Sequence, residues 1–96
     1  MFKDLDPILH SQLRLAIVSI LISTREADFN FIKKTTKATS GNISAQIKKL
    51  QEVGYISVVK SFKKNYQNTS LKITARGIES FEKYVDSLKQ YFKTDQ

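Results

Sequence analysis

The sequence has no cysteine and a single histidine, and its acidic residues are few beside its lysines and arginines. Without cysteine the chain can form no disulfide, no thiolate metal site and no cysteine nucleophile, which fits a reducing compartment. His10 has no acidic cluster beside it, so we interpret it as a structural or surface residue. A glycine-rich phosphate loop and an acid cluster for a metal are lacking too. We therefore expect no enzymatic activity, no cofactor and no metal.

Long hydrophobic runs are also absent. The longest apolar segment, residues 13–22, is too short to span a membrane and is interrupted by Arg14 and Ser19. Residues 1–6 contain two acids and no apolar run, so we expect no signal peptide and a cytoplasmic location. A chain of 96 residues with 41% hydrophobic residues can still bury the core of one small domain.

Acidic residues are scarcest in the middle of the chain. Residues 33–64 hold eight lysines and one acid, Glu52, which accounts for the whole net charge of +7. The flanking segments nearly balance, at −1 for residues 1–32 and +1 for residues 65–96. Such segregation is typical of a nucleic-acid-binding surface. A membrane surface would attract the same charge, but these lysines do not line the polar face of one long amphipathic helix.

Residues 39–53 are predicted to form an amphipathic helix that Thr39 caps and Gly54 ends. One side of the helical wheel carries Ile43, Ile47, Leu50 and Val53. The first turns of the other side carry only small or polar residues, followed by two lysines: Ser40, Gly41, Asn42, Ser44, Ala45, Gln46, Lys48 and Lys49. This composition suits a recognition helix in the major groove of DNA, because small residues permit close approach and polar ones can contact base edges. An ordinary solvent-exposed helix is the alternative.

The sequence after Gly54 alternates with a period of two, over residues 56–61 and again over residues 70–74, which predicts a β-hairpin. The tip, residues 62–68, is basic and carries an aromatic side chain. A lysine-bearing hairpin directly after a recognition helix is a wing that can contact phosphates or the minor groove. A solvated loop is the alternative. We expect the wing contacts to come from Lys60, Lys63, Lys64, Asn65, Tyr66 and Gln67.

Three further helices are predicted. The first runs over residues 7–23, with Asp6 as N-cap and Pro7 in the first position. A short helix over residues 29–36, capped by Asp28, follows a connecting or edge segment. The last helix runs over residues 75–92, with Thr74 as its cap and Gly77 tolerated in its first turn.

The first and last helices carry more apolar surface than one small domain can cover, which predicts a homodimer. The first helix is apolar nearly all round, and the far end of the last should project beyond its own core. Alternatively, the last helix folds back to seal its own domain. The expected interface residues are Ile8, Leu15, Val18, Ile22, Tyr84, Leu88, Tyr91 and Phe92.

Residues 5–92 resemble small winged-helix transcriptional regulators of the MarR/ArsR-like type. The segments that carry the resemblance are LHSQLRLAIVSIL, ADFNFIKKTTKATSGNISAQIKKLQEVGYISVVK and SLKITARGIESFEKYVDSLK. The most specific parts are TSGNIS followed by IKKLQEVGYI, and LKITARGIESF. The resemblance implies a mainly α fold with a small β-hairpin (α+β), a winged helix-turn-helix with N- and C-terminal dimerisation helices. It implies one domain over residues 1–96, with the recognition helix at about 39–53, the wing at about 55–74 and the C-terminal helix at about 75–92.

The resemblance also implies a sequence-specific regulator, expected to be a repressor, that binds a palindromic site in double-stranded DNA as a homodimer. The expected helix contacts are Thr39, Ser40, Gly41, Asn42, Ser44, Ala45, Lys48 and Lys49. Many relatives have an arginine-rich wing, whereas this wing has lysines, so we expect it to hold phosphates rather than read bases. The alternative is a winged helix that binds protein or RNA; a protein-interaction module should not bind a DNA duplex at physiological salt.

Overall fold

The computed structural model describes residues 2–64 and 66–92. Its elements are, in order, α1 (Gln12–Thr24), β1 (Glu26–Asp28), α2 (Phe29–Thr36), α3 (Ser40–Glu52), β2 (Ile56–Lys63), β3 (Tyr66–Ile73) and α4 (Ala75–Lys89). The fold is therefore mainly α with a small antiparallel sheet, as predicted. Among the described residues, no helix is long and apolar enough to cross a membrane.

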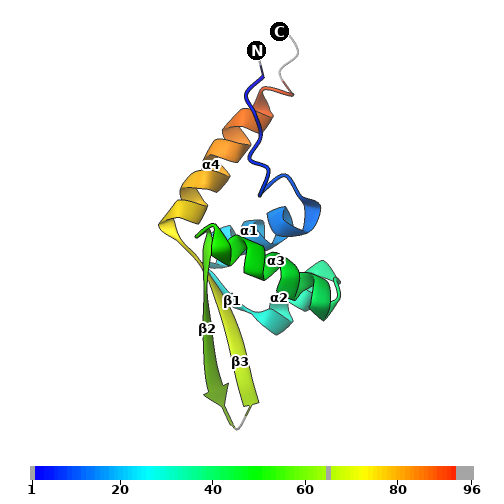
Figure 1. Cartoon of the computed structure of the whole chain (residues 1–96), viewed down its shortest axis with the longest axis vertical. Helices are drawn as coiled ribbons and strands as arrows, with labels where there is room; N and C mark the ends of the chain where they lie inside the picture. Colours follow the sequence, from blue (N-terminus) through cyan, green and yellow to red (C-terminus); the bar gives the residue numbers. More distant parts are fainter. Residues whose placement is uncertain (1, 65, 93–96) are drawn as a thin grey trace.

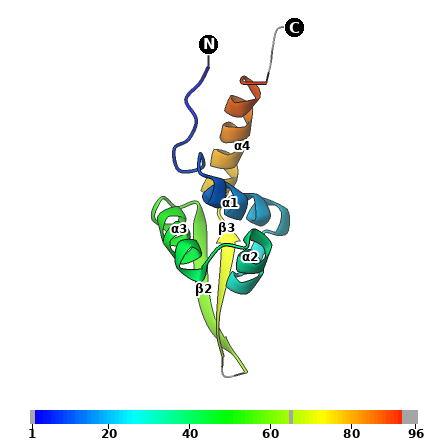
Figure 2. The ribbon, with the colours of Figure 1, turned by 90° about the vertical axis from the view of Figure 1, so that its right-hand side faces the viewer.

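Three helices and the base of the sheet form the body of the molecule. The β2–β3 hairpin and α4 project from this body. The strand order is β1-β3-β2, with β3 antiparallel to both neighbours. Helices α1, α2 and α3 pack at the base of the sheet, while the β2–β3 hairpin leaves the body in one direction and α4 in the other (Figures 1 and 2). The longest dimension of the molecule, 57 Å, runs from the hairpin to the end of α4.

The core lies where α1, α2, α3 and β3 meet. The side chains buried most completely are Leu9, Ile17, Val18, Leu21, Ile32, Ile43, Leu50 and Leu71. Helix α3 contributes Ile43, Ile47 and Leu50, as its apolar spacing predicts. Because these residues fix the inner face of α3, the outer face is fixed as well.

The predicted helix caps of α2, α3 and α4 are confirmed. The side chain of Asp28 accepts a hydrogen bond from the Phe31 amide at 2.8 Å. Thr39 accepts one from the Asn42 amide at 3.2 Å, and Thr74 accepts one from the Gly77 amide at 3.0 Å. Gly54 has φ = 81°, the left-handed conformation expected after α3. Each cap satisfies an amide that the helix itself leaves without a partner.

The predicted start of the first helix is wrong. Residues 7–9 form a separate turn, and α1 begins at Gln12 with Ser11 as its N-cap. The Asp6 carboxylate does accept a hydrogen bond from the Ile8 amide at 2.8 Å, so it caps this one turn. Its other oxygen accepts a hydrogen bond from the Tyr55 hydroxyl at 2.6 Å. This contact ties the turn to a residue 49 positions along the chain.

Two features of α4 also differ from the prediction. The helix ends at Lys89, because the next three amides bond to carbonyls three residues back, in a tighter 3₁₀-like turn. Gly77 is not merely tolerated. A Cβ at this position would lie 2.2 Å from the Tyr55 carbonyl oxygen, so only glycine fits there.

Candidate nucleic-acid interface

The predicted recognition residues form one exposed surface on α3. Their side chains from Thr39 through Ala45 are exposed, apart from the core residue Ile43, and so are Lys48 and Lys49. Gly41 has nothing within 4 Å of the place where a Cβ would stand. The outer face therefore offers hydroxyl, amide and ammonium groups with little bulk between them.

A chain of hydrogen bonds holds the amide of Asn42. The Arg14 side chain in α1 donates from Nε to the Ile8 carbonyl at 2.6 Å and from Nη1 to Gln46 Oε1 at 2.5 Å. Gln46 Nε2 in turn donates to Asn42 Oδ1 at 3.0 Å. The Asn42 NH₂ group is thereby aimed by its neighbours. Sequence reasoning missed Arg14, because its partner on α3 is 32 residues away and no local signal links them.

The hairpin is a wing eight residue pairs long, from Ile56↔Ile73 to Lys63↔Tyr66. Lys60, Lys64, Tyr66 and Gln67 are exposed along its outer half. Lys63 is paired in the strand. Of the predicted wing residues, Asn65 lies outside the described residues.

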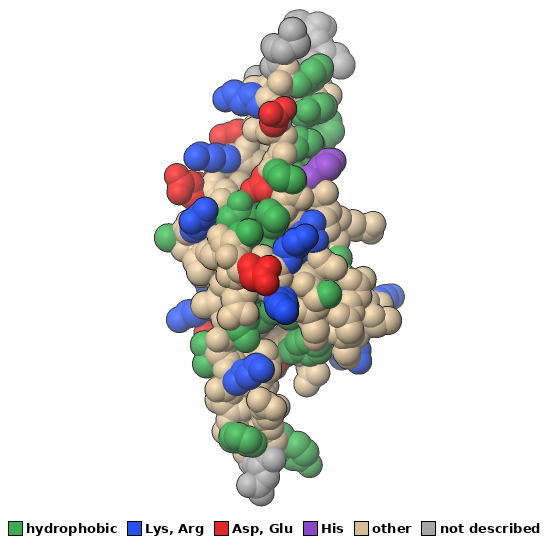
Figure 3. Space-filling model, in the orientation of Figure 1, with side chains coloured by type: hydrophobic (Ala, Val, Ile, Leu, Met, Phe, Trp, Pro, Cys, Tyr) green, Lys and Arg blue, Asp and Glu red, His purple; other side chains and the backbone are tan. Residues whose placement is uncertain are grey.

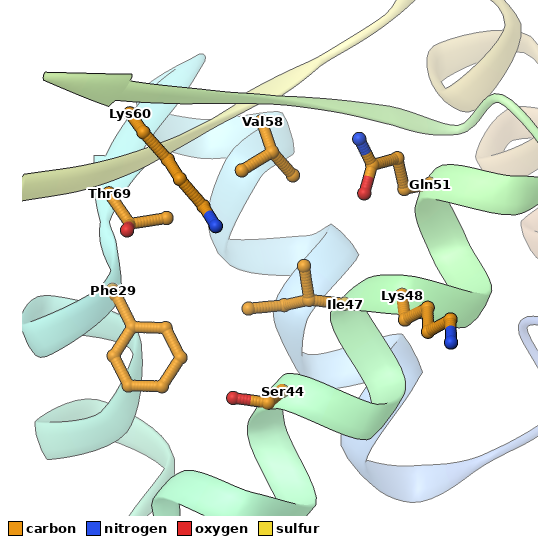
Figure 4. Close-up of a pocket in the computed structure, with 8 residues that line it drawn as sticks. All are labelled: Phe29, Ser44, Ile47, Lys48, Gln51, Val58, Lys60 and Thr69. Atoms are coloured by element: carbon orange, nitrogen blue, oxygen red, sulfur yellow. The ribbon is translucent and has the colours of Figure 1, made fainter.

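A hollow of about 240 Å³ separates α3 from the wing. Figure 4 shows Lys60 and Thr69 from the hairpin and Ser44 and Ile47 from α3 turned toward the same space. The two predicted DNA-contacting elements therefore border one continuous surface. The lining residues are Phe29, Ser44, Ile47, Lys48, Gln51, Val58, Lys60 and Thr69.

Within the described part of the chain, the lysines of α2 and α3 form no ion pair, and neither do Lys60 and Lys64 of the wing. The two pairs found there, Lys83–Glu79 and Lys89–Asp86, both lie on α4 at 3.9 Å. A phosphate approaching α3 or the wing would not have to displace a protein carboxylate from these lysines.

The structure corrects the predicted dimer surface at two positions. Val18 has no exposed surface and Tyr84 is 4% exposed, because both are covered within the protomer. Ile8, Leu15, Ile22 and Leu88 are half-buried, and Tyr91 and Phe92 are exposed. The apolar periodicity predicted that Val18 is buried, but it did not predict that other residues of the same protomer bury it.

The N-terminal segment covers one side of α4. The Phe2 ring stacks on Tyr91 with 4.6 Å between centroids, and the Lys3 amide donates to Gln90 Oε1 at 3.1 Å. His10 Nδ1 lies 3.0 Å from the Tyr84 hydroxyl, which gives it the structural role expected of it. Figure 3 shows hydrophobic side chains gathered along the edge formed by this segment and α4.

The chain is similar to known proteins in both sequence and structure. The model of the Winged helix DNA-binding domain family matches residues 13–92. An uncharacterized protein of Methanocaldococcus jannaschii is 33% identical over 86 residues, covering 90% of this chain and 94% of that protein. The structure of a transcriptional regulator homologue from Pyrococcus horikoshii OT3 superposes with a TM-score of 0.84 at 30% identity, covering 90% of this chain and 85% of that one.

More distant solved structures share the fold. One is the MarR mutant C80S from E. coli complexed with operator DNA, with a TM-score of 0.70 and 14% identity. This chain covers 56% of that protein's length, and 83% of this chain is matched.

Proposed function

The chain belongs to the winged helix DNA-binding domain family, and we propose that it is a transcriptional regulator that binds a specific site in double-stranded DNA. In this proposal α3 enters the major groove and the β2–β3 wing contacts the backbone or the adjacent minor groove. The observation that carries the proposal is the outer face of α3. Its side chains are small, polar and exposed, and they are followed by two lysines that form no ion pair with any described residue.

Helix α3 is proposed to read bases with its first two turns. Asn42 and Ser44 present an amide and a hydroxyl, the groups that hydrogen-bond base edges. Gly41 and Ala45 leave room for close approach, and Ser40 and Thr39 lie at the helix N-terminus, where a phosphate is favoured. Lys48 and Lys49 follow where the helix would leave the groove, and they are assigned to phosphates.

The wing is proposed to hold the backbone. Lys60, Lys63 and Lys64 carry compact charges without the planar fork with which arginine binds a guanine or a phosphate in two places. They therefore suit phosphate contacts that position the protein. Asn65, Tyr66 and Gln67 are proposed as further contacts from their positions in the sequence.

We propose that the regulator acts as a homodimer. The corrected surface consists of Phe2, Ile8, Leu15, Ile22, Leu88, Tyr91 and Phe92, and its most exposed members are Phe92 at 72% and Phe2 at 60%. Burial of this surface against a second copy would remove apolar groups from water and place two α3 helices about a two-fold axis. The DNA site would then be palindromic. Occupancy of such a site would obstruct transcription, so repression is the expected sign.

Selection of random duplexes with the purified protein tests the proposal, because it reports both DNA binding and the site. On the selected duplex, Asn42→Ala and Ser44→Ala should each lose about 1–3 kcal/mol of binding free energy. Their binding to random duplex should hardly change. Ser57→Ala is the matched control, since Ser57 is exposed on the opposite face of β2 from Val58.

Two results would contradict the proposal. If no sequence is enriched and no duplex binds at physiological salt, the domain is a protein- or RNA-binding module. If the two α3 variants lose the same affinity on selected and random duplexes, these side chains do not read bases.

A further inference from the structure

Two aromatic side chains stand almost fully exposed at the tip of the wing. Phe62 is 77% exposed and Tyr66 is 76% exposed. The strand register places them in adjacent pairs, Phe62↔Gln67 and Lys63↔Tyr66, at the end of the hairpin. Figure 3 shows hydrophobic surface on both sides of this tip. Water contact with so much aromatic surface is unfavourable, and no prediction from the sequence assigned Phe62 a role.

These two side chains lie away from the core of the described residues. Strand β1 pairs with β3 only as far as Asp28↔Ser70, so the hairpin beyond that pair is a ribbon of two strands. Neither Phe62 nor Tyr66 belongs to the core or packs on it. Burial in the core therefore does not explain these two aromatic groups.

The direction of Phe62 follows from the strand alternation. Side chains of a strand alternate between its faces, so Phe62 shares a face with Lys60 and Val58. Val58 and Lys60 line the hollow beside α3, and Figure 4 shows both turned toward it. Phe62 thus extends, by one more step, the face of the wing that borders the proposed DNA surface. Tyr66 lies on the opposite face of the ribbon.

The charge around the tip indicates a polyanion as the occupant. No aspartate or glutamate occurs between Glu52 and Glu79, whereas Lys60, Lys63 and Lys64 lie within six residues of Phe62 and Tyr66 in the sequence. Lys64 has φ = 51°, a left-handed conformation that glycine or asparagine adopts at lower cost. A cation thus sits at the turn where an uncharged residue would be less strained.

We propose that the wing tip is an aromatic wedge for duplex DNA, with Phe62 inserted against a base step from the minor groove and the lysines on the flanking phosphates. This inference rests on the proposed function. Apolar side chains placed this way partly unstack a base step and bend the duplex by roughly 20–90°. Tyr66, on the other face of the ribbon, packs its ring on the sugar–phosphate edge and keeps its hydroxyl in water.

The experiment uses the duplex recovered by random selection, with 2-aminopurine at successive positions in each flank and a dye pair at its ends. Wild-type protein should raise 2-aminopurine fluorescence at one step per flank and shorten the distance between the dyes. Phe62→Ala should abolish both signals and weaken binding roughly 5- to 100-fold, the range for losing one stacked base. Phe62→Leu should keep most of the bend, because leucine can also act as a wedge.

Val59→Ala is the matched control. Val59 is a 52% exposed apolar residue on the same strand, nearer the body, and its truncation should change neither signal. Unfolding midpoints of all three variants should equal that of the wild type, because none of the side chains is in the core. A loss of binding by Phe62→Ala can then be assigned to the contact with DNA.

The possible results of this experiment distinguish failure of the wedge proposal from failure of the proposed function. Specific binding by the wild type to a straight duplex, with no 2-aminopurine signal and no effect of Phe62→Ala, overturns the wedge and leaves DNA recognition by α3 intact. If the wild type selects no duplex, both the wedge and the proposed DNA recognition by α3 are wrong. Binding of the wild type to vesicles of anionic lipid, and not to the duplex, also overturns the wedge if Phe62→Ala abolishes it, because the tip would then be a membrane contact.

Discussion

Gly77→Ala tests the closest contact between α4 and the rest of the domain. The added Cβ would lie 2.2 Å from the Tyr55 carbonyl oxygen and 2.8 Å from Ile73 Cδ1. The Tyr55 peptide cannot easily move away. Its amide donates to the Leu50 carbonyl at 3.0 Å, and its carbonyl oxygen accepts from the Thr74 amide at 3.1 Å. The collision therefore has to be relieved by a shift of α4.

Three contributions determine how much Gly77→Ala lowers the free energy of unfolding. Overpacking costs typically about 1–3 kcal/mol, and a contact with fixed backbone belongs at the upper end. A shift of α4 that breaks the Thr74–Tyr55 hydrogen bond costs about 1 kcal/mol more. Alanine returns about 1 kcal/mol, because it favours a helix more than glycine does. The net loss is about 2–3 kcal/mol, which for a domain of this size lowers Tm by roughly 10–20 °C.

Urea denaturation followed by circular dichroism measures this loss, and Gly41→Ala is the matched control. Gly41 also lies in the first turn of a helix, but a Cβ there meets nothing within 4 Å. Gly41→Ala should therefore be neutral or stabilise the protein, by up to about 1 kcal/mol. If Gly77→Ala proves as stable as the wild type, α4 does not pack against the Tyr55 backbone as described.

Three further predictions concern specificity, assembly and pH. Arg14→Met should keep the fold but relax the base preference read by the start of α3, and an unchanged preference in random-duplex selection would contradict the hydrogen-bonded positioning. Light scattering should give about 22 kDa for the wild type, twice its 11.0 kDa, and the monomer mass for Leu88→Glu with Tyr91→Glu; a wild-type monomer at micromolar concentration rules out the dimer. Burial, and after it the hydrogen bond to Asp6, raises the pKa of the Tyr55 phenol above the unfolded-state value of 10.0. The stabilisation that the protonated phenol gives the folded state is therefore present below pH 10.0, and it is lost as the pH rises through the higher pKa of the folded state. Tyr55→Phe should lose about 1–2 kcal/mol near neutral pH and less at alkaline pH, and parallel denaturation profiles for the two proteins across that range would refute the linkage.

Helix α3 could be predicted well because its signals are local. The spacing of Ile43, Ile47 and Leu50 fixes the buried face, and Thr39 and Gly54 fix the two ends within the same stretch of chain. The order of the remaining elements could be predicted for the same reason, since caps and the change of period mark most of their boundaries. Which residues of the α3 face and the wing contact DNA remains a prediction.

Features that depend on distant contacts could not be predicted. Asp6 and Pro7 carry a valid helix-start signal, but it serves a single turn because Asp6 is also held by Tyr55. From the sequence, Gly77 is only a residue of low helix propensity. The structure shows that it is required because the Tyr55 backbone lies beside it. Apolar periodicity likewise shows that Val18 is covered without showing by which element.

The turn at residues 7–10 joins the two surfaces on which the proposed function depends. Its Ile8 carbonyl accepts from Arg14, whose hydrogen bonds continue through Gln46 to Asn42 on the reading face of α3. Its His10 contacts Tyr84 on α4, the helix that carries the proposed dimer surface. A helix continuous from residue 7, as the sequence predicted, would have carried these groups in one rigid rod. Because the turn is separate from α1, it is held by side-chain hydrogen bonds on both sides, from Arg14 to the Ile8 carbonyl and between His10 and Tyr84.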